Sequence, residues 1–100
     1  MNDGLTPQYR KIIREILAKA TRIDRAVLFG SRATGTFGRA SDIDLALEGQ
    51  NLDLSDVARL RSEFAESSLP FDVDVIIRAD IAHPKLEDCI EKQGIVFYEK

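Results

Sequence analysis

The sequence has one cysteine, no tryptophan and no long apolar run. Cys89 has no cysteine partner and no histidine or cysteine neighbours in a zinc-binding pattern, so we expect a buried structural thiol and no redox chemistry. No stretch approaches the roughly 20 apolar residues of a membrane-spanning helix. The first residues also lack the basic segment followed by an apolar one that marks a secretory signal. We therefore expect a soluble, cytoplasmic protein without disulfides.

The chain is short and mildly acidic, with 100 residues and a net charge of −3. This length suits one hydrophobic core, so we expect a single domain over residues 1–100. The net charge argues against a broad basic face for duplex nucleic acid. Segment 22–39 differs, because four arginines against one aspartate give it a net charge of +3. It could attract phosphate or be an ordinary solvated face. Its arginines are Arg22, Arg25, Arg32 and Arg39.

Three stretches carry apolar residues at helical spacing, and each follows a typical helix start. The starts are Thr6-Pro7, Asp53 and Pro84, and the expected helices cover about residues 7–21, 54–67 and 84–93. In the second helix, Leu54 and Phe64 are expected on the same apolar side. Gly94 is expected to close the last helix in a left-handed conformation.

Four further stretches predict strands, over residues 26–29, 41–48, 71–77 and 95–98. The first is a continuous apolar run, which suits a strand buried on both faces, whereas the second and third alternate between polar and apolar residues. Residues 31–40 are rich in Gly, Ser, Thr and Arg and predict a turn with at most one turn of helix. Strands and helices together indicate an α/β (α+β) domain.

The alternating strands both carry aspartates on the face away from the core. Asp42 and Asp44 leave the same face of one strand, with Cα atoms about 6.6 Å apart. Asp74 joins them if the two strands are neighbours, although Asp72 shares its face and competes for the same role. Clustered carboxylates repel each other unless a cation neutralises them, and oxygen ligands favour Mg²⁺ or Mn²⁺. Asp-x-Asp is nevertheless found more often as two solvent-facing acids on an edge strand.

Gly30-Ser31 follows the buried strand and could bind phosphate. Glycine lets the backbone approach an anion closely, and Ser31 adds a hydroxyl and a backbone N–H, especially if a helix begins there. Taken alone, a Gly-Ser pair is common in turns. Its combination with the aspartates is far less common, and two metal ions beside a triphosphate would suit an in-line displacement.

The sequence resembles the DNA-polymerase-beta-like nucleotidyltransferase superfamily in the spacing of its motifs, which are Gly30-Ser31, then ten residues, then Asp42-Ile43-Asp44 and a later Asp74. The run from Leu28 to Gly35 is most similar to its minimal, MNT-type branch, which often has an arginine in place of Thr34. The resemblance implies a nucleotidyltransferase fold, with a mixed sheet of about four strands packed against three to four helices. It also implies ATP as the donor and Mg²⁺ or Mn²⁺ as the cofactor, in two ions.

The resemblance also implies roles for individual residues. Asp42, Asp44 and Asp74 would be the catalytic and metal-binding residues, and Asp74 would help to activate the acceptor hydroxyl. Asp74 is favoured over Asp72 by its position relative to Pro70-Phe71. The nucleotide would be held by Gly30, Ser31 and Arg32, whereas Arg39 could touch phosphate or remain a solvated loop residue.

Nothing in 100 residues is left over for the acceptor-binding domain of larger members, so the acceptor must come from another molecule. MNT-type proteins resemble antitoxins that act beside a helical HEPN partner, where AMP is placed on a tyrosine of that partner. This similarity predicts an adenylyltransferase antitoxin in complex with a HEPN-type toxin. Two alternatives stay open: a non-catalytic module that neutralises the partner by occlusion, and a small-molecule nucleotidyltransferase, which the small size disfavours. Homo-oligomers and hetero-oligomers are both compatible with the sequence.

Overall fold

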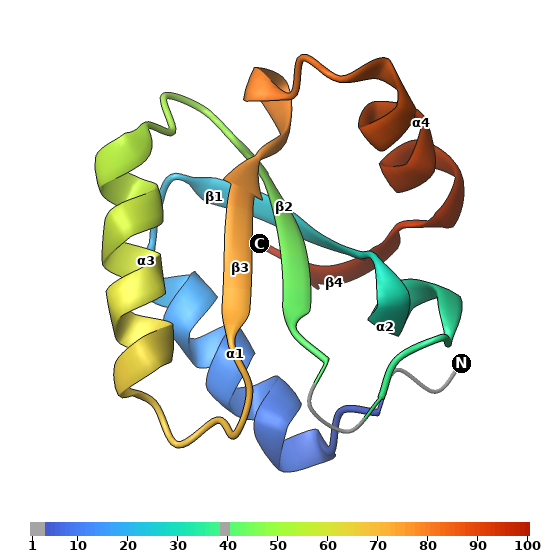
Figure 1. Cartoon of the computed structure of the whole chain (residues 1–100). Coiled ribbons are helices and arrows are strands. Elements are labelled where there is room, and N and C mark those ends of the chain that lie inside the picture. Colours follow the sequence, from blue (N-terminus) through green and yellow to red (C-terminus); the bar gives the residue numbers. More distant parts are fainter. Residues whose placement is uncertain (1–3, 39–40) are drawn as a thin grey trace.

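Four strands form one mixed sheet in the order β3-β2-β1-β4 (Figure 1). The computed structural model describes residues 4–38 and 41–100. β1 pairs with β2 and β4 in antiparallel fashion, and β2 pairs with β3 in parallel. The strands are β1 (Ile23–Phe29), β2 (Ile43–Gly49), β3 (Val73–Ile77) and β4 (Ile95–Glu99). The mixed, four-stranded sheet of the predicted fold is therefore confirmed.

Helices cover both faces of the sheet. The helices α1 (Pro7–Lys19) and α3 (Leu54–Glu66) bury their apolar sides in the main core, and α4 (Pro84–Gln93) packs on the opposite face through Ile90. A single helical turn, α2 (Ser31–Thr34), follows β1, and a 3₁₀ turn, η1 (Arg78–Asp80), follows β3. Along the described residues, no helix is long and apolar enough to cross a membrane.

The predicted alternation of β2 and β3 is confirmed. Their core-facing residues are at most 8% exposed and pack with α1 and α3; they are Ile43, Leu45, Leu47, Val73, Val75 and Ile77. Ala46 and Ile76 point to the face covered by α4. The aspartates that share this alternation therefore lie on the α4 side of the sheet, outside the main core.

The predicted helix starts are also confirmed. The Oγ1 atom of Thr6 accepts a hydrogen bond from the backbone N–H of Tyr9. Asp53 accepts from the backbone of Asp56, whose own carboxylate accepts from the N–H of Asp53, a reciprocal capping box. The first helix ends at Lys19 rather than near residue 21, because β1 begins at Ile23, three residues before the predicted start.

Three sequence-based expectations are wrong in detail. Gly94 has φ −67°, so it is not a left-handed cap. A Cβ atom at this position would lie against the carbonyl oxygen of Ile90 and 2.6 Å from Cγ1 of Val27. The close packing of α4 on β1 therefore demands glycine here. Leu54 is 80% exposed, although its spacing placed it on the apolar side of α3. Cys89 is only partly buried, and its thiol lies 3.2 Å from Oε1 of Gln93.

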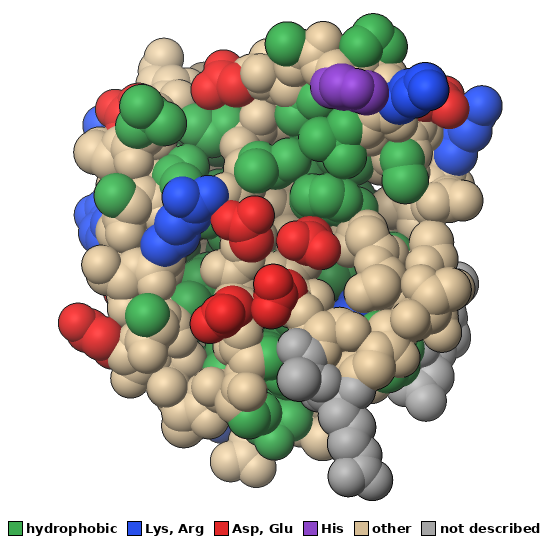
Figure 2. All heavy atoms as spheres, viewed as in Figure 1, with side chains coloured by type: hydrophobic (Ala, Val, Ile, Leu, Met, Phe, Trp, Pro, Cys, Tyr) green, Lys and Arg blue, Asp and Glu red, His purple; other side chains and the backbone are tan. Residues whose placement is uncertain are grey.

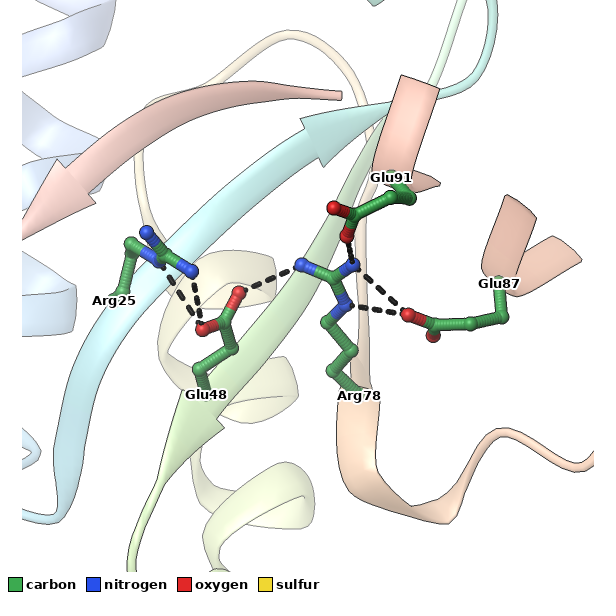
Figure 3. A network of polar contacts seen from close by, with 5 residues as sticks. All are labelled: Arg25, Glu48, Arg78, Glu87 and Glu91. Carbon is green, nitrogen blue, oxygen red and sulfur yellow. Dashed lines mark hydrogen bonds and ion pairs between the residues drawn. The ribbon is translucent and has the colours of Figure 1, made fainter. Parts of the chain in front are cut away.

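A network of five charged side chains fastens α4 to the end of the sheet remote from the aspartates (Figure 3). Arg25 of β1 donates twice to Oε1 of Glu48, while Arg78 of η1 donates to Oε2 of the same residue at 2.9 Å. Arg78 also donates to two carboxylates of α4, those of Glu87 and Glu91. Both oxygens of Glu48 are thus satisfied by cations from different elements.

We expect Glu48→Gln to lower the free energy of unfolding by about 1 kcal/mol at pH 7. Burial alone raises the pKa of Glu48, but hydrogen bonds and charges from Arg25 and Arg78 outweigh it and hold this pKa below the usual 4.5. The unfolded chain then binds the proton more readily, so the stabilisation is present above pH 4.5 and is lost as the pH falls through the folded-state pKa.

Urea unfolding of the wild type and the variant at pH 7 and at pH 3 measures this difference. Glu66→Gln is the matched control, because Glu66 is exposed on α3 and forms no ion pair with the described residues. An equal loss at both pH values would contradict the assignment.

Candidate active site

Aspartates gather where β2 and β3 begin, and Figure 2 shows acidic side chains clustered on this face. The parallel register pairs Asp44 with Asp74, so the two strands are neighbours, as the predicted site requires. Asp42 directly precedes β2 and Asp72 directly precedes β3. The fold therefore brings together the three aspartates of the predicted site, Asp42, Asp44 and Asp74, with Asp72 beside them.

A cavity of about 710 Å³ opens beside these acids. Asp42, Asp72 and Asp74 line it, together with Arg61 of α3 and apolar residues that include Phe71. Asp44 is not part of the lining and lies beside the end of β1, where it pairs with Phe29. The cavity is thus on the β3 side of the acid cluster.

The carboxylate of Asp44 is destabilised by its surroundings. Burial raises its pKa above the usual 3.8, and the negative charges of Asp74 and Asp42 raise it further. Asp74 has a cationic partner instead, since Nη2 of Arg61 donates to its Oδ1 at 2.8 Å. A cation at the acid cluster would relieve the repulsion on Asp44.

Gly30 lies against Asp44 on the side away from the cavity. Phe29 pairs with Asp44 in the β1–β2 register, so the next residue, Gly30, ends the strand beside the carboxylate. Gly30 has φ +80° and ψ −155°, and a Cβ atom there would lie 2.6 Å from Oδ2 of Asp44. Only glycine allows this contact. Ser31 then opens α2, with its side chain partly exposed.

Arg32, which the resemblance assigns to the nucleotide, is buried and holds the backbone of a neighbouring segment. It is 2% exposed, and Nε and Nη2 both donate to the carbonyl oxygen of Ser41, at 3.0 and 2.9 Å. Its guanidinium stacks on the rings of Phe37 and Phe71. One side chain thereby ties α2 to the residue before Asp42 and to the loop before β3. Arg39 lies outside the described residues.

The donor set fits Mg²⁺ or Mn²⁺ in its chemistry. Among residues 4–38 and 41–100, no three Asp, Glu, His or Cys side chains already converge into a metal-binding group. Proteins usually hold Mg²⁺ by only one or two carboxylates, and substrate phosphates and water complete its shell. The oxygen-only ligands and the repulsion at Asp44 are the conditions that such a cation needs.

Sequence reasoning missed Arg61. It is an exposed helix arginine with no motif around it, and its contact with Asp74 depends on how α3 packs beside β3. No local pattern could reveal a contact between residues 13 positions apart on different elements.

The chain is similar to known proteins along most of its length. The family model for polymerase beta nucleotidyltransferases matches residues 11–100. A curated relative, the probable protein adenylyltransferase MntA of Haemophilus influenzae, is 33% identical over 90 residues, which cover 89% of this chain and 78% of the relative.

Two solved structures show the same fold. A toxin–antitoxin with AMP-PNP has a TM-score of 0.75 and 29% identity, over 91% of this chain and 73% of that one. A mutant of the MntA–HpeT toxin–antitoxin has a TM-score of 0.72 and 28% identity, over 97% of this chain and 75% of that one.

We expect Gly30→Ala to be more destabilising than Gly35→Ala. Both glycines have positive φ, +80° and +85°, so alanine costs on the order of 1 kcal/mol of backbone strain at either position. Only at position 30 would the new Cβ atom also meet Oδ2 of Asp44, since nothing lies within 4 Å at position 35.

Urea unfolding should therefore show an additional loss of about 1 kcal/mol or more for Gly30→Ala. The double variant Gly30→Ala/Asp44→Ala should recover that additional loss, because it removes the carboxylate that the methyl group meets. Equal losses for the two glycine variants would show that the contact with Asp44 is not a constraint.

Asp44→Asn should raise the melting temperature at pH 7 in buffer free of divalent cations. Because the pKa of Asp44 is raised in the folded state, its ionised carboxylate lowers the free energy of unfolding. This loss of stability is absent below the usual pKa of 3.8 and grows as the pH rises through the folded-state pKa. The gain should thus vanish near pH 3. Asp24→Asn is the control, because Asp24 is exposed and forms no ion pair with the described residues. A lower melting temperature for Asp44→Asn at pH 7 would refute this account.

Proposed function

Because the chain belongs to the polymerase beta nucleotidyltransferase family, we propose that it transfers an adenylyl group from ATP to a hydroxyl of a HEPN-type toxin. The chain would thereby act as the antitoxin in the bacterial cytoplasm. The acceptor that we propose is a tyrosine of the partner. The relatives support the adenylyl transfer and the antitoxin role: one is named a probable protein adenylyltransferase, and a structural neighbour is a toxin–antitoxin with AMP-PNP, an ATP analogue.

The observation that carries this proposal is the order of groups across the sheet. Gly30 at the end of β1 lies on one side of Asp44, and Asp74 with the cavity lies on the other. Nucleotidyl transfer needs the leaving pyrophosphate and the attacking hydroxyl on opposite sides of the reacting phosphorus. An ATP held at Gly30-Ser31 and an acceptor in the cavity would meet this requirement.

The residues have the following proposed roles. Gly30 and Ser31 hold the triphosphate, because a backbone without Cβ admits a close approach of phosphate. Asp42, Asp44 and Asp74 ligate Mg²⁺ or Mn²⁺, in two ions, which when bound neutralise phosphate charge. Asp74 orients the acceptor hydroxyl and takes its proton as the oxygen bonds to the α-phosphorus and pyrophosphate departs. Arg32 acts indirectly, since it keeps Ser41 and therefore Asp42 in place.

Intact-mass spectrometry tests the proposal. The chain, its toxin partner, ATP and Mg²⁺ should yield the partner with the mass of AMP added. The double variant Asp42→Asn/Asp44→Asn should lower the rate by about 10³-fold or more. Asp24→Asn, a matched change at an exposed position of β1, should leave the rate unchanged.

The same variants separate catalysis from occlusion. Size-exclusion chromatography should show that the double variant still binds the partner, while cells that express the toxin should lose protection. Continued protection by the double variant, or no AMP on the partner at full occupancy of the complex, would overturn the catalytic proposal in favour of occlusion.

A further inference from the structure

Arg61 bridges α3 and β3 at the edge of the acid cluster. Its Nη2 atom donates to Oδ1 of Asp74 at 2.8 Å and to the backbone carbonyl oxygen of Val75 at 3.2 Å. β3 is an edge strand of the sheet, and this second bond ties the guanidinium to its backbone. The guanidinium therefore contacts both the backbone of β3 and the Asp74 carboxylate.

Arg61 is also the cation that the structure provides to these acids. Asp42, Asp44, Asp72 and Asp74 lie together, and within the described part of the chain the pair with Arg61 is the one ion pair that any of them makes. The pair itself is exposed, with 54% of the Arg61 side chain and 53% of the Asp74 side chain accessible. Exposed ion pairs contribute little free energy, so this one can be exchanged readily.

We propose that Arg61 is a positioning residue that occupies Asp74 while no divalent cation is bound and is displaced from Oδ1 when one binds. This inference rests on the proposed metal-binding role of Asp74. A cation coordinated by Asp74 would lie close to the guanidinium that bonds the same carboxylate, and two positive charges repel. Arg61 and the metal ion therefore compete for the carboxylate of Asp74. Arg61 weakens metal binding until a bound nucleotide adds further negative charge.

The position of Arg61 gives this exchange a second consequence. The side chain lines the cavity beside Asp74 and also an apolar groove of about 320 Å³ on the outer side of β3. Release of Asp74 leaves Arg61 anchored on Val75, where it can turn away from the cavity. Metal binding would thus move a side chain that lines the acceptor cavity.

The proposal is tested by titrating the protein with Mn²⁺ in the absence of nucleotide and measuring the free ion by electron paramagnetic resonance. Arg61→Ala should bind Mn²⁺ about three- to tenfold more tightly than the wild type, whereas Arg61→Lys, which keeps the charge, should stay closer to the wild type. Arg59→Ala is the matched control. It removes the same charge two residues earlier on α3, but Arg59 pairs with Asp56 and not with Asp74. The affinity of this variant for Mn²⁺ should therefore equal that of the wild type.

A double-mutant cycle distinguishes competition from a general effect of charge. Asp74→Asn should weaken Mn²⁺ binding, and Arg61→Ala added to it should have little further effect. Arg61→Ala that binds Mn²⁺ no more tightly than Arg59→Ala overturns the proposal and leaves the metal site standing. Two other outcomes would overturn the proposal together with the metal role of Asp74. One is that neither the wild type nor Arg61→Ala binds Mn²⁺, and the other is that Asp74→Asn binds Mn²⁺ as tightly as the wild type.

Discussion

Repulsion between carboxylates on adjacent strands is the constraint around which the rest of the molecule is arranged. The core requires Leu45 and Val75 to face α1 and α3, and the alternation of a strand then places Asp44 and Asp74 side by side on the other face. The fold cannot separate these charges without turning its core outwards. The stabilising contacts must therefore be supplied by other parts of the structure. Burial, together with the negative charges of Asp74 and Asp42, raises the pKa of Asp44.

One face of the sheet shows how this repulsion is offset. Along β2, Asp44 lies among like charges, Ala46 is buried beneath α4, and Glu48 is bonded to two arginines. Charges of one sign collect at one end, and charges of both signs alternate at the other, where they fasten α4 (Figure 3). The contacts that fasten α4 thus lie away from the acids, where Arg61 pairs with Asp74.

The sequence predicted those features that depend on local patterns. Alternation identified the faces of β2 and β3, and Thr6 and Asp53 identified helix starts, because each signal lies within a few residues. The β2–β3 pairing was only conditional, since 30 positions separate its partners Asp44 and Asp74. The burial of Arg32 and the contact of Arg61 were out of reach for the same reason, since both depend on how loops and helices pack around the sheet. Leu54 shows the converse: regular spacing does not ensure burial at the first turn of a helix.

The contact between Gly30 and Asp44 restricts how such a protein can diverge. As long as an acid occupies position 44, a side chain at position 30 meets its carboxylate, so the two positions constrain each other. Without that acid the close contact is absent, and only the backbone strain of φ +80° remains, on the order of 1 kcal/mol. A bulky residue in place of this glycine is therefore expected to accompany the loss of the acid at position 44 and, with it, of the proposed chemistry.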